Sequence, residues 1–120
     1  HSSVVTGNFE ATAQVKLEAA GLSHYLARGA YASDSDHRPD LPAIARERWE
    51  LATARRIAAA QCVIVGDTPK DLQCARANGM KCVLVGTGRY RVEELEYWRP
   101  DACLADLSDT QQVVGLLANL

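Results

Sequence analysis

The segment CVIVGDTPKD, residues 62–71, joins an uninterrupted apolar run to an acidic turn. Such runs are typical of strands buried in parallel sheets, and Pro69 suits the first turn of a following helix. Asp67 stands at the predicted strand tip, and Asp71 falls in the first helical turn. Two carboxylates this close can jointly bind a hard cation such as Mg²⁺. Thr68 with Asp71 would also form an acceptable helix cap, but a cap does not require Asp67.

Strand and helix patterns alternate along the rest of the chain. Apolar runs predict five strands: Ser3–Thr6, Arg28–Ala32, Cys62–Val65, Lys81–Val85 and Ala102–Ala105. Helical spacing and stop signals predict five helices: Phe9–Ala20, Leu41–Ala59, Pro69–Asn78, Val92–Trp98 and Asp109–Asn119, the last capped by Asp109 or Ser108. This alternation implies an α/β fold with a parallel sheet covered on both faces. Ligands bind such sheets at the carboxyl ends of the strands.

Composition narrows the classes of partner. The chain has 120 residues, near the size of one domain, with 48% hydrophobic residues and a net charge of -2. That charge argues against a nucleic-acid or membrane-surface partner. No apolar run approaches the ~20 residues needed to span a bilayer, and no secretory pattern is visible. Four cysteines without a CxxC pair predict buried free thiols in a reducing cytoplasm.

Three other strand ends carry polar groups. Thr6, Gly7 and Asn8 offer a hydroxyl, bare backbone and an amide that can bind phosphate, although the same tripeptide is common in turns. Arg38, in the polar loop 33–40, can clamp a phosphate or simply be solvated. Competing arginines on the following helix are Arg46 and Arg48. The segment 86–90 has two glycines of a dinucleotide fingerprint but lacks the third, so it is interpreted as a tight turn.

These segments together resemble the haloacid dehalogenase (HAD) superfamily of phosphatases, especially its phosphoglycolate phosphatase-like branch. Residues 4–8, VVTGN, resemble the second motif of that family, and residues 63–71 resemble its fourth motif, GDTxxD. Residues 75–80 and 83–88 also resemble this branch, so the resemblance covers nearly the whole chain. It implies a Rossmann-like three-layer parallel sheet and a Mg²⁺-dependent phosphomonoester hydrolase acting on a phosphorylated small molecule.

The resemblance also implies residue roles. Asp67 would ligate Mg²⁺ with support from Asp71. Thr6 would hydrogen-bond the transferring phosphoryl group, helped by the backbone at residues 7 and 8. Arg38 would take the place of the third motif and orient nucleophile and phosphate, although the usual spacing of that motif is not reproduced.

The first motif of the family, DxDx(T/V), supplies the nucleophile and does not occur in this chain. The DxD spacing of Asp34 and Asp36 lies in a polar loop after the second motif, so we reject it. Residues 1–120 therefore resemble the C-terminal part of a HAD-like core domain without its N-terminal central strand and cap, and residues 1–3 resemble a tag remnant. We expect the chain to be inactive alone and to self-associate through exposed sheet edges. The alternative is a non-catalytic HAD-like interaction or regulatory module.

Overall fold

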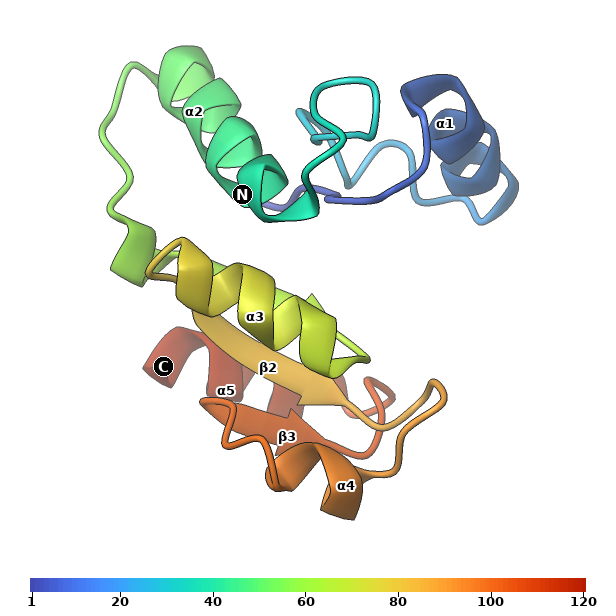
Figure 1. The fold of residues 1–120 in the computed structure, drawn as a ribbon, viewed down its shortest axis with the longest axis vertical. Coiled ribbons are helices and arrows are strands. Elements are labelled where there is room, and N and C mark those ends of the chain that lie inside the picture. Colours follow the sequence, from blue (N-terminus) through green and yellow to red (C-terminus); the bar gives the residue numbers. More distant parts are fainter. The chain divides into compact units, whose positions relative to one another are not determined.

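The computed structural model describes residues 1–120, which form two compact parts, His1–Ile57 and Ala58–Leu120 (Figure 1). Each part has its own buried cluster of apolar side chains. No helix is long and apolar enough to cross a membrane. No cysteine forms a disulfide, as the sequence predicts. The prediction that all four are buried is wrong for two of them: Cys74 and Cys82 are buried, whereas Cys62 and Cys103 are only partly buried.

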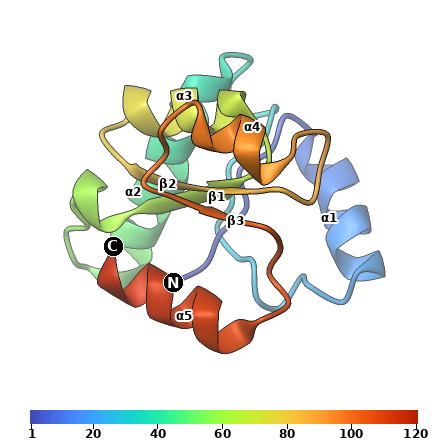
Figure 2. The same cartoon turned by 90° about the horizontal axis from the view of Figure 1, so that it is seen from below.

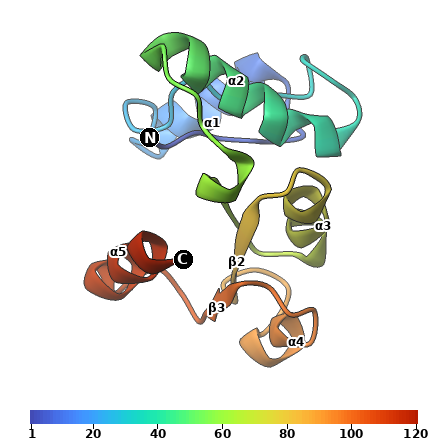
Figure 3. The same cartoon turned by 90° about the vertical axis from the view of Figure 1, so that its left-hand side faces the viewer.

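The C-terminal part contains a three-stranded parallel sheet in the order β1-β2-β3. The strands are β1 (Val63–Gly66), β2 (Lys81–Val85) and β3 (Ala102–Leu104). Helices α3 (Pro69–Ala77) and α4 (Val92–Glu96) cover one face, and α5 (Thr110–Asn119) lies on the other (Figures 2 and 3). The predicted parallel α/β class, with helices on both faces, is confirmed.

The register of β1 on β2 brings two strand tips together. Ile64 pairs with Cys82, and Gly66 pairs with Leu84. Alternate residues of both strands therefore face α3, where they form one core. Its buried members are Leu72, Ala75, Met80, Cys82, Leu84 and Leu95. The turns that leave β1 and β2 consequently lie side by side at the carboxyl edge of the sheet.

The N-terminal part is built on α1 (Glu10–Ala19), a short 3₁₀ turn η1 (Arg38–Asp40) and α2 (Leu41–Thr53). Ala30, Leu41 and Ala45 form its buried cluster, with Val5 packed against it. The backbone of residues 4–6 runs parallel to residue 30 through two hydrogen bonds. They join Thr6 N to the Ala30 carbonyl at 3.1 Å and Ala30 N to the Val4 carbonyl at 2.9 Å.

Two predicted strands, Ser3–Thr6 and Arg28–Ala32, are wrong as strands: they meet only in an isolated bridge between Val5 and Ala30. Arg28 has a left-handed backbone (φ 54°), which ends any extended run on its N-terminal side. Beyond Ala30, the Asp34 carboxylate accepts from Tyr31 N at 2.9 Å and closes a turn. Extended structure is therefore limited from both ends.

The predicted helix Leu41–Ala59 is also wrong in its length, because α2 ends at Thr53. Ala54 takes a left-handed conformation (φ 52°) that terminates the helix. The Glu50 carboxylate then accepts from Ile57 N at 2.7 Å and turns the chain back, ahead of a 3₁₀ turn η2 (Ala59–Gln61). The remaining boundaries agree with prediction within two residues, and β2 agrees at both ends.

Candidate functional site

The acidic turn after β1 is organised around one oxygen atom. Asp71 Oδ2 accepts from Asp67 N at 3.1 Å, from Thr68 N at 3.0 Å and from Thr68 Oγ1 at 3.0 Å. The Asp71 side chain is buried, with 9% of the residue exposed. A carboxylate in the first turn of α3 also interacts favourably with the positive end of the helix dipole. The capping interpretation of Asp71 is therefore correct for this residue.

Gly66 is required by the position of Asp71. A Cβ built on Gly66 would lie 2.5 Å from Asp71 Cβ and closer still to its carboxylate. Two carbon atoms that are not bonded to each other cannot approach so closely. Any side chain at residue 66 would therefore displace Asp71. The bare backbone at the end of β1 thus lets the buried carboxylate reach back to its donors.

Asp67 occupies a different environment four residues earlier. It is exposed at the tip of β1, and no hydrogen bond or ion pair engages its carboxylate. Only its backbone N–H is used, by Asp71. The turn therefore contains one carboxylate that shapes the backbone and one that remains available for a ligand.

The turn after β2 packs against this available carboxylate. A Cβ built on Gly88 would lie 3.0 Å from Asp67 Cγ and 3.1 Å from Asp67 Cβ, with Oδ2 nearer still. The Asp67 side chain thus fills the space that a side chain at residue 88 would need. Sequence reasoning treated segment 86–90 only as a tight turn and missed this contact. The parallel pairing of β1 with β2, which places their tips side by side, is the signal that could have indicated it.

Residues 6–8 form a compact loop in the N-terminal part. Thr6 Oγ1 accepts from Asn8 N and from Asn8 Nδ2, both at 3.1 Å. A hydroxyl oxygen has two acceptor sites and one donor hydrogen. Because both acceptor sites face Asn8, the remaining capacity of the Thr6 hydroxyl is to donate. That is the capacity needed to bind an anionic oxygen.

Comparison with known proteins identifies the family. The profile of the HAD-hydrolase-like family matches residues 38–110, more than half of the chain. The chain belongs to this family. A curated relative, a 5'-nucleotidase of Pseudomonas aeruginosa, is 36% identical over 64 residues, which are 53% of this chain and 29% of the relative. The chain thus matches less than a third of that relative's length. The matched family segment includes the acidic turn and Arg38 but not residues 6–8.

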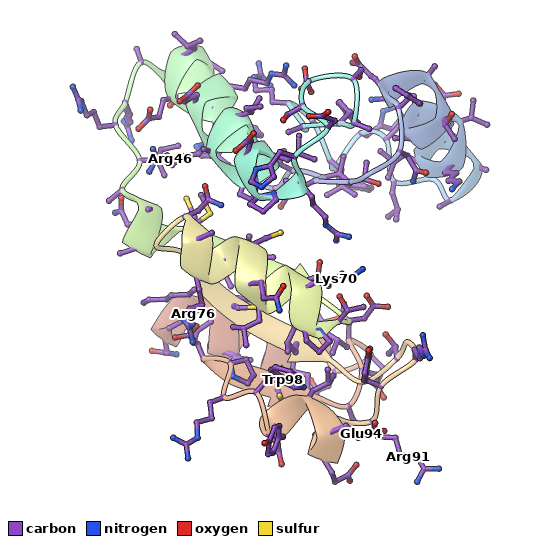
Figure 4. The ribbon with its side chains drawn as sticks, in the orientation of Figure 1. Arg46, Lys70, Arg76, Arg91, Glu94 and Trp98 are labelled. Atoms are coloured by element: carbon purple, nitrogen blue, oxygen red, sulfur yellow. The ribbon has the colours of Figure 1, made fainter.

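The three candidate arginines of this HAD-like chain differ in their surroundings. Arg48 forms a two-pronged ion pair with Asp34, at 2.9 and 2.6 Å, and also donates to the Gly29 carbonyl. The hydrogen bond from Arg48 is the main cause that holds the pKa of Asp34 below its ordinary value. Arg48 is thereby committed to the fold of the N-terminal part. Arg38 lies exposed at the start of η1, directly before Pro39, and Arg46 lies on α2 (Figure 4).

The acidic turn offers one exposed carboxylate, that of Asp67, as a ligand for Mg²⁺. HAD-like hydrolases generally use this cation. No group of three or more His, Cys, Asp or Glu side chains converges anywhere in the chain. Mg²⁺ is commonly bound through one or two carboxylates, with waters and substrate phosphate completing the octahedron. An exposed carboxylate at Asp67, on a turn fixed by a second carboxylate, is compatible with that pattern. Figure 4 shows Lys70 at the same end of α3, pointing away from the helix.

Proposed function

We propose that this chain supplies the phosphate-binding and metal-binding loops of a Mg²⁺-dependent phosphomonoester hydrolase. The observation that carries the proposal is the division within the acidic turn. Asp71 satisfies the backbone of the turn by itself, so the fold has no need of the Asp67 carboxylate. An exposed, unengaged carboxylate at the carboxyl edge of a parallel sheet is suited to binding a cation.

In this proposal each residue has one task. Asp67 binds Mg²⁺, and Asp71 holds the turn from which Asp67 projects. When bound, Mg²⁺ would neutralise charge on the phosphate and help to orient it. Thr6 donates its hydroxyl hydrogen to a phosphoryl oxygen, with help from the backbone N–H group of Gly7. The backbone N–H of Asn8, which the sequence also predicts to bind phosphate, already donates to Thr6 Oγ1, so Asn8 supports the loop and does not contact phosphate through that group. Arg38 pairs with negative charge on the transferring group.

The nucleophile of this proposal comes from outside the 120 residues. In HAD-type chemistry, by the resemblance described above, an aspartate carboxylate attacks phosphorus, the bond from phosphorus to the leaving oxygen breaks, and the leaving oxygen takes up a proton. Water then cleaves the aspartyl-phosphate to release inorganic phosphate. The segment carrying this aspartate would add a strand beside β1, which here pairs with β2 alone. Without that segment the same open edge would favour self-association.

Two small-molecule classes are the first substrates to test. The matched relative is named a 5'-nucleotidase, which directs attention to nucleoside 5'-monophosphates. The sequence resemblance to the phosphoglycolate phosphatase-like branch directs attention to short phosphorylated acids. The free thiols are compatible with the reducing cytoplasm where both classes occur.

The test compares the protein expressed from its complete gene with the 120-residue chain. Phosphate release is measured with nucleoside 5'-monophosphates and with phosphoglycolate, in Mg²⁺ and in EDTA. We expect Mg²⁺-dependent turnover by the gene product and none by the 120-residue chain. Asp67→Asn should lower turnover roughly 100-fold or more, since removing metal-assisted charge stabilisation costs several kcal/mol.

Two outcomes would contradict the proposal. Turnover by the 120-residue chain would show that the nucleophile lies within it. A gene product that binds Mg²⁺ but hydrolyses no ester in either class would favour the alternative, a non-catalytic interaction or regulatory module.

A further inference from the structure

We propose that the turn after β2 sets the position of the Asp67 carboxylate and that Gly88 is the positioning residue. The proposal rests on the metal-binding role of Asp67 proposed above. It adds the turn after β2 as a second element that borders the same site. It assigns a function to segment 86–90, which contributes no ligand of its own.

Gly88 and the Asp67 side chain compete for one space. The added Cβ at residue 88 would lie within 3.1 Å of two Asp67 side-chain atoms besides Oδ2. The three nearest atoms all belong to the Asp67 side chain, with the terminal Oδ2 closest and Cβ farthest at 3.1 Å. Gly88 also does not have a left-handed φ, since the positive-φ glycines are Gly21 and Gly79. Alanine is therefore compatible with the local backbone, and the conflict falls on the Asp67 side chain.

Segment 86–90 is held at both ends. Gly86 N donates to the Leu104 carbonyl at 2.8 Å, and a Cβ at Gly86 would lie 2.8 Å from Val92 Cγ2. At the other end, Tyr90 packs on the core cluster beneath α4. In Figure 1 the connection leaves the arrowhead of β2, extends outward as a loop and then enters α4. Because its ends are fixed, an extra methyl group at residue 88 is relieved more easily by rotating Asp67 than by moving the turn.

The three glycines at the two strand tips differ in what an added Cβ would meet. At Gly66 an added Cβ meets the buried carboxylate of Asp71, and at Gly86 it meets Val92, including its backbone N at 3.2 Å. Both substitutions disturb packed structure. Gly88 alone of these three faces the exposed, unengaged Asp67. A substitution there should change the metal site while leaving the fold intact.

The experiment uses the protein expressed from its complete gene, with Mn²⁺ as a spectroscopic probe for the Mg²⁺ site. Mn²⁺ affinity is measured by electron paramagnetic resonance for wild type, Gly88→Ala, Asp67→Asn and the double variant. We expect Gly88→Ala to weaken Mn²⁺ binding about 10-fold, the scale typical of residues that orient a metal ligand. Its midpoint of thermal unfolding in EDTA should not fall below that of wild type, because the conflict falls on an exposed side chain and not on packed structure. In the double variant, Gly88→Ala should add nothing to the loss caused by Asp67→Asn.

The outcomes separate this inference from the proposed function. If Asp67→Asn weakens Mn²⁺ binding and Gly88→Ala does not, the positioning role is wrong and the metal-binding role of Asp67 stands. If Asp67→Asn binds Mn²⁺ like wild type, the proposed metal site itself is wrong. A large fall in the unfolding midpoint of Gly88→Ala in EDTA, or an additional loss in the double variant, would show that Gly88 acts on the fold and would also overturn the inference.

Discussion

Asp71→Ala tests whether one buried carboxylate holds the acidic turn. The substitution removes the acceptor shared by Asp67 N, Thr68 N and Thr68 Oγ1. The Thr68 hydroxyl can rotate toward solvent, but the two backbone N–H groups cannot. They would be left at the start of α3 without their charged partner, and the fold would lose a cap as well as a packed side chain.

The magnitude follows from counting these donors. A hydrogen bond to a charged group contributes about 1.5–3 kcal/mol to stability, and a partly solvated turn belongs at the lower end of that range. Two backbone donors therefore predict a loss of about 3–4 kcal/mol for Asp71→Ala. Asp71→Asn keeps one oxygen acceptor without the charge and should lose about half as much. The control is Asp109→Ala, which removes a single cap bond to Gln112 N and should cost about 1 kcal/mol.

Urea unfolding measures these losses, with Trp98 as the fluorescent reporter. Trp98 lies in the same compact part as Asp71, whereas Trp49 lies in the other part, so all variants carry Trp49→Phe. The urea midpoint should fall in the order wild type, Asp109→Ala, Asp71→Asn, Asp71→Ala, with an unchanged slope. If Asp71→Ala costs no more than Asp109→Ala, Asp71 does not hold the turn, and the distinction between the two carboxylates fails.

Two further predictions concern ionisable groups in the C-terminal part. Burial raises the pKa of Asp101, but the Cys82 N–H and the Arg76 guanidinium outweigh it and hold that pKa below its usual value. A carboxyl group whose pKa is lowered in the folded state stabilises the fold above about pH 4, and this stabilisation is lost as the pH falls further. Asp101→Asn should therefore weaken the fall of the urea midpoint at acid pH. An unchanged fall would contradict this prediction. Burial, followed by the nearby Asp71 charge, raises the pKa of the Cys82 thiol to about 12. Cys82 should therefore resist a thiol reagent at pH 8 until the chain unfolds, while the half-buried Cys62 reacts, as mass spectrometry of labelled peptides would show.

The fold of the C-terminal part was predictable because its local signals agree with one another. β2 was predicted at both ends, since Val83 and Leu84 are almost fully buried on opposite faces of the sheet. Gly79 ends α3 with the left-handed backbone expected of a glycine cap (φ 66°), and Asp109 caps α5 through Gln112 N. In these places propensity, periodicity and tertiary packing favour the same structure.

The N-terminal part was less predictable because non-glycine residues adopt unusual backbone conformations there. The left-handed Arg28 interrupts a predicted strand, and the left-handed Ala54 interrupts a predicted helix. Neither arginine nor alanine is a residue type that predicts a left-handed backbone. Tertiary side-chain contacts also redirect the chain, as the Glu50 carboxylate does at Ile57 N. Such contacts join residues whose separation of seven positions gives no periodic signal.

The sequence places both carboxylates of the candidate site in one turn after a strand, but it does not show how their surroundings differ. Sequence reasoning assigned Asp67 and Asp71 jointly to a metal, because two carboxylates in one turn look chemically equivalent. Burial and hydrogen bonding distinguish them: Asp71 is enclosed and accepts from three donors, while Asp67 is exposed with no partner for its carboxylate. The packing of Gly88 on Asp67 depends on the register of two strands separated by an entire helix.

An acidic turn after a strand is by itself weak support for a metal site, because helix caps use the same residues. Here the backbone donors of the turn can be assigned one by one, and Asp71 accounts for those of Asp67 and Thr68. The Asp67 carboxylate is left without a structural task, although Gly66 and Gly88 both leave room that the two carboxylates occupy. A fold that needed only a cap would require the first of these spaces and not the second. The bare backbone at Gly88 therefore gives the Asp67 side chain a contact that capping alone does not explain.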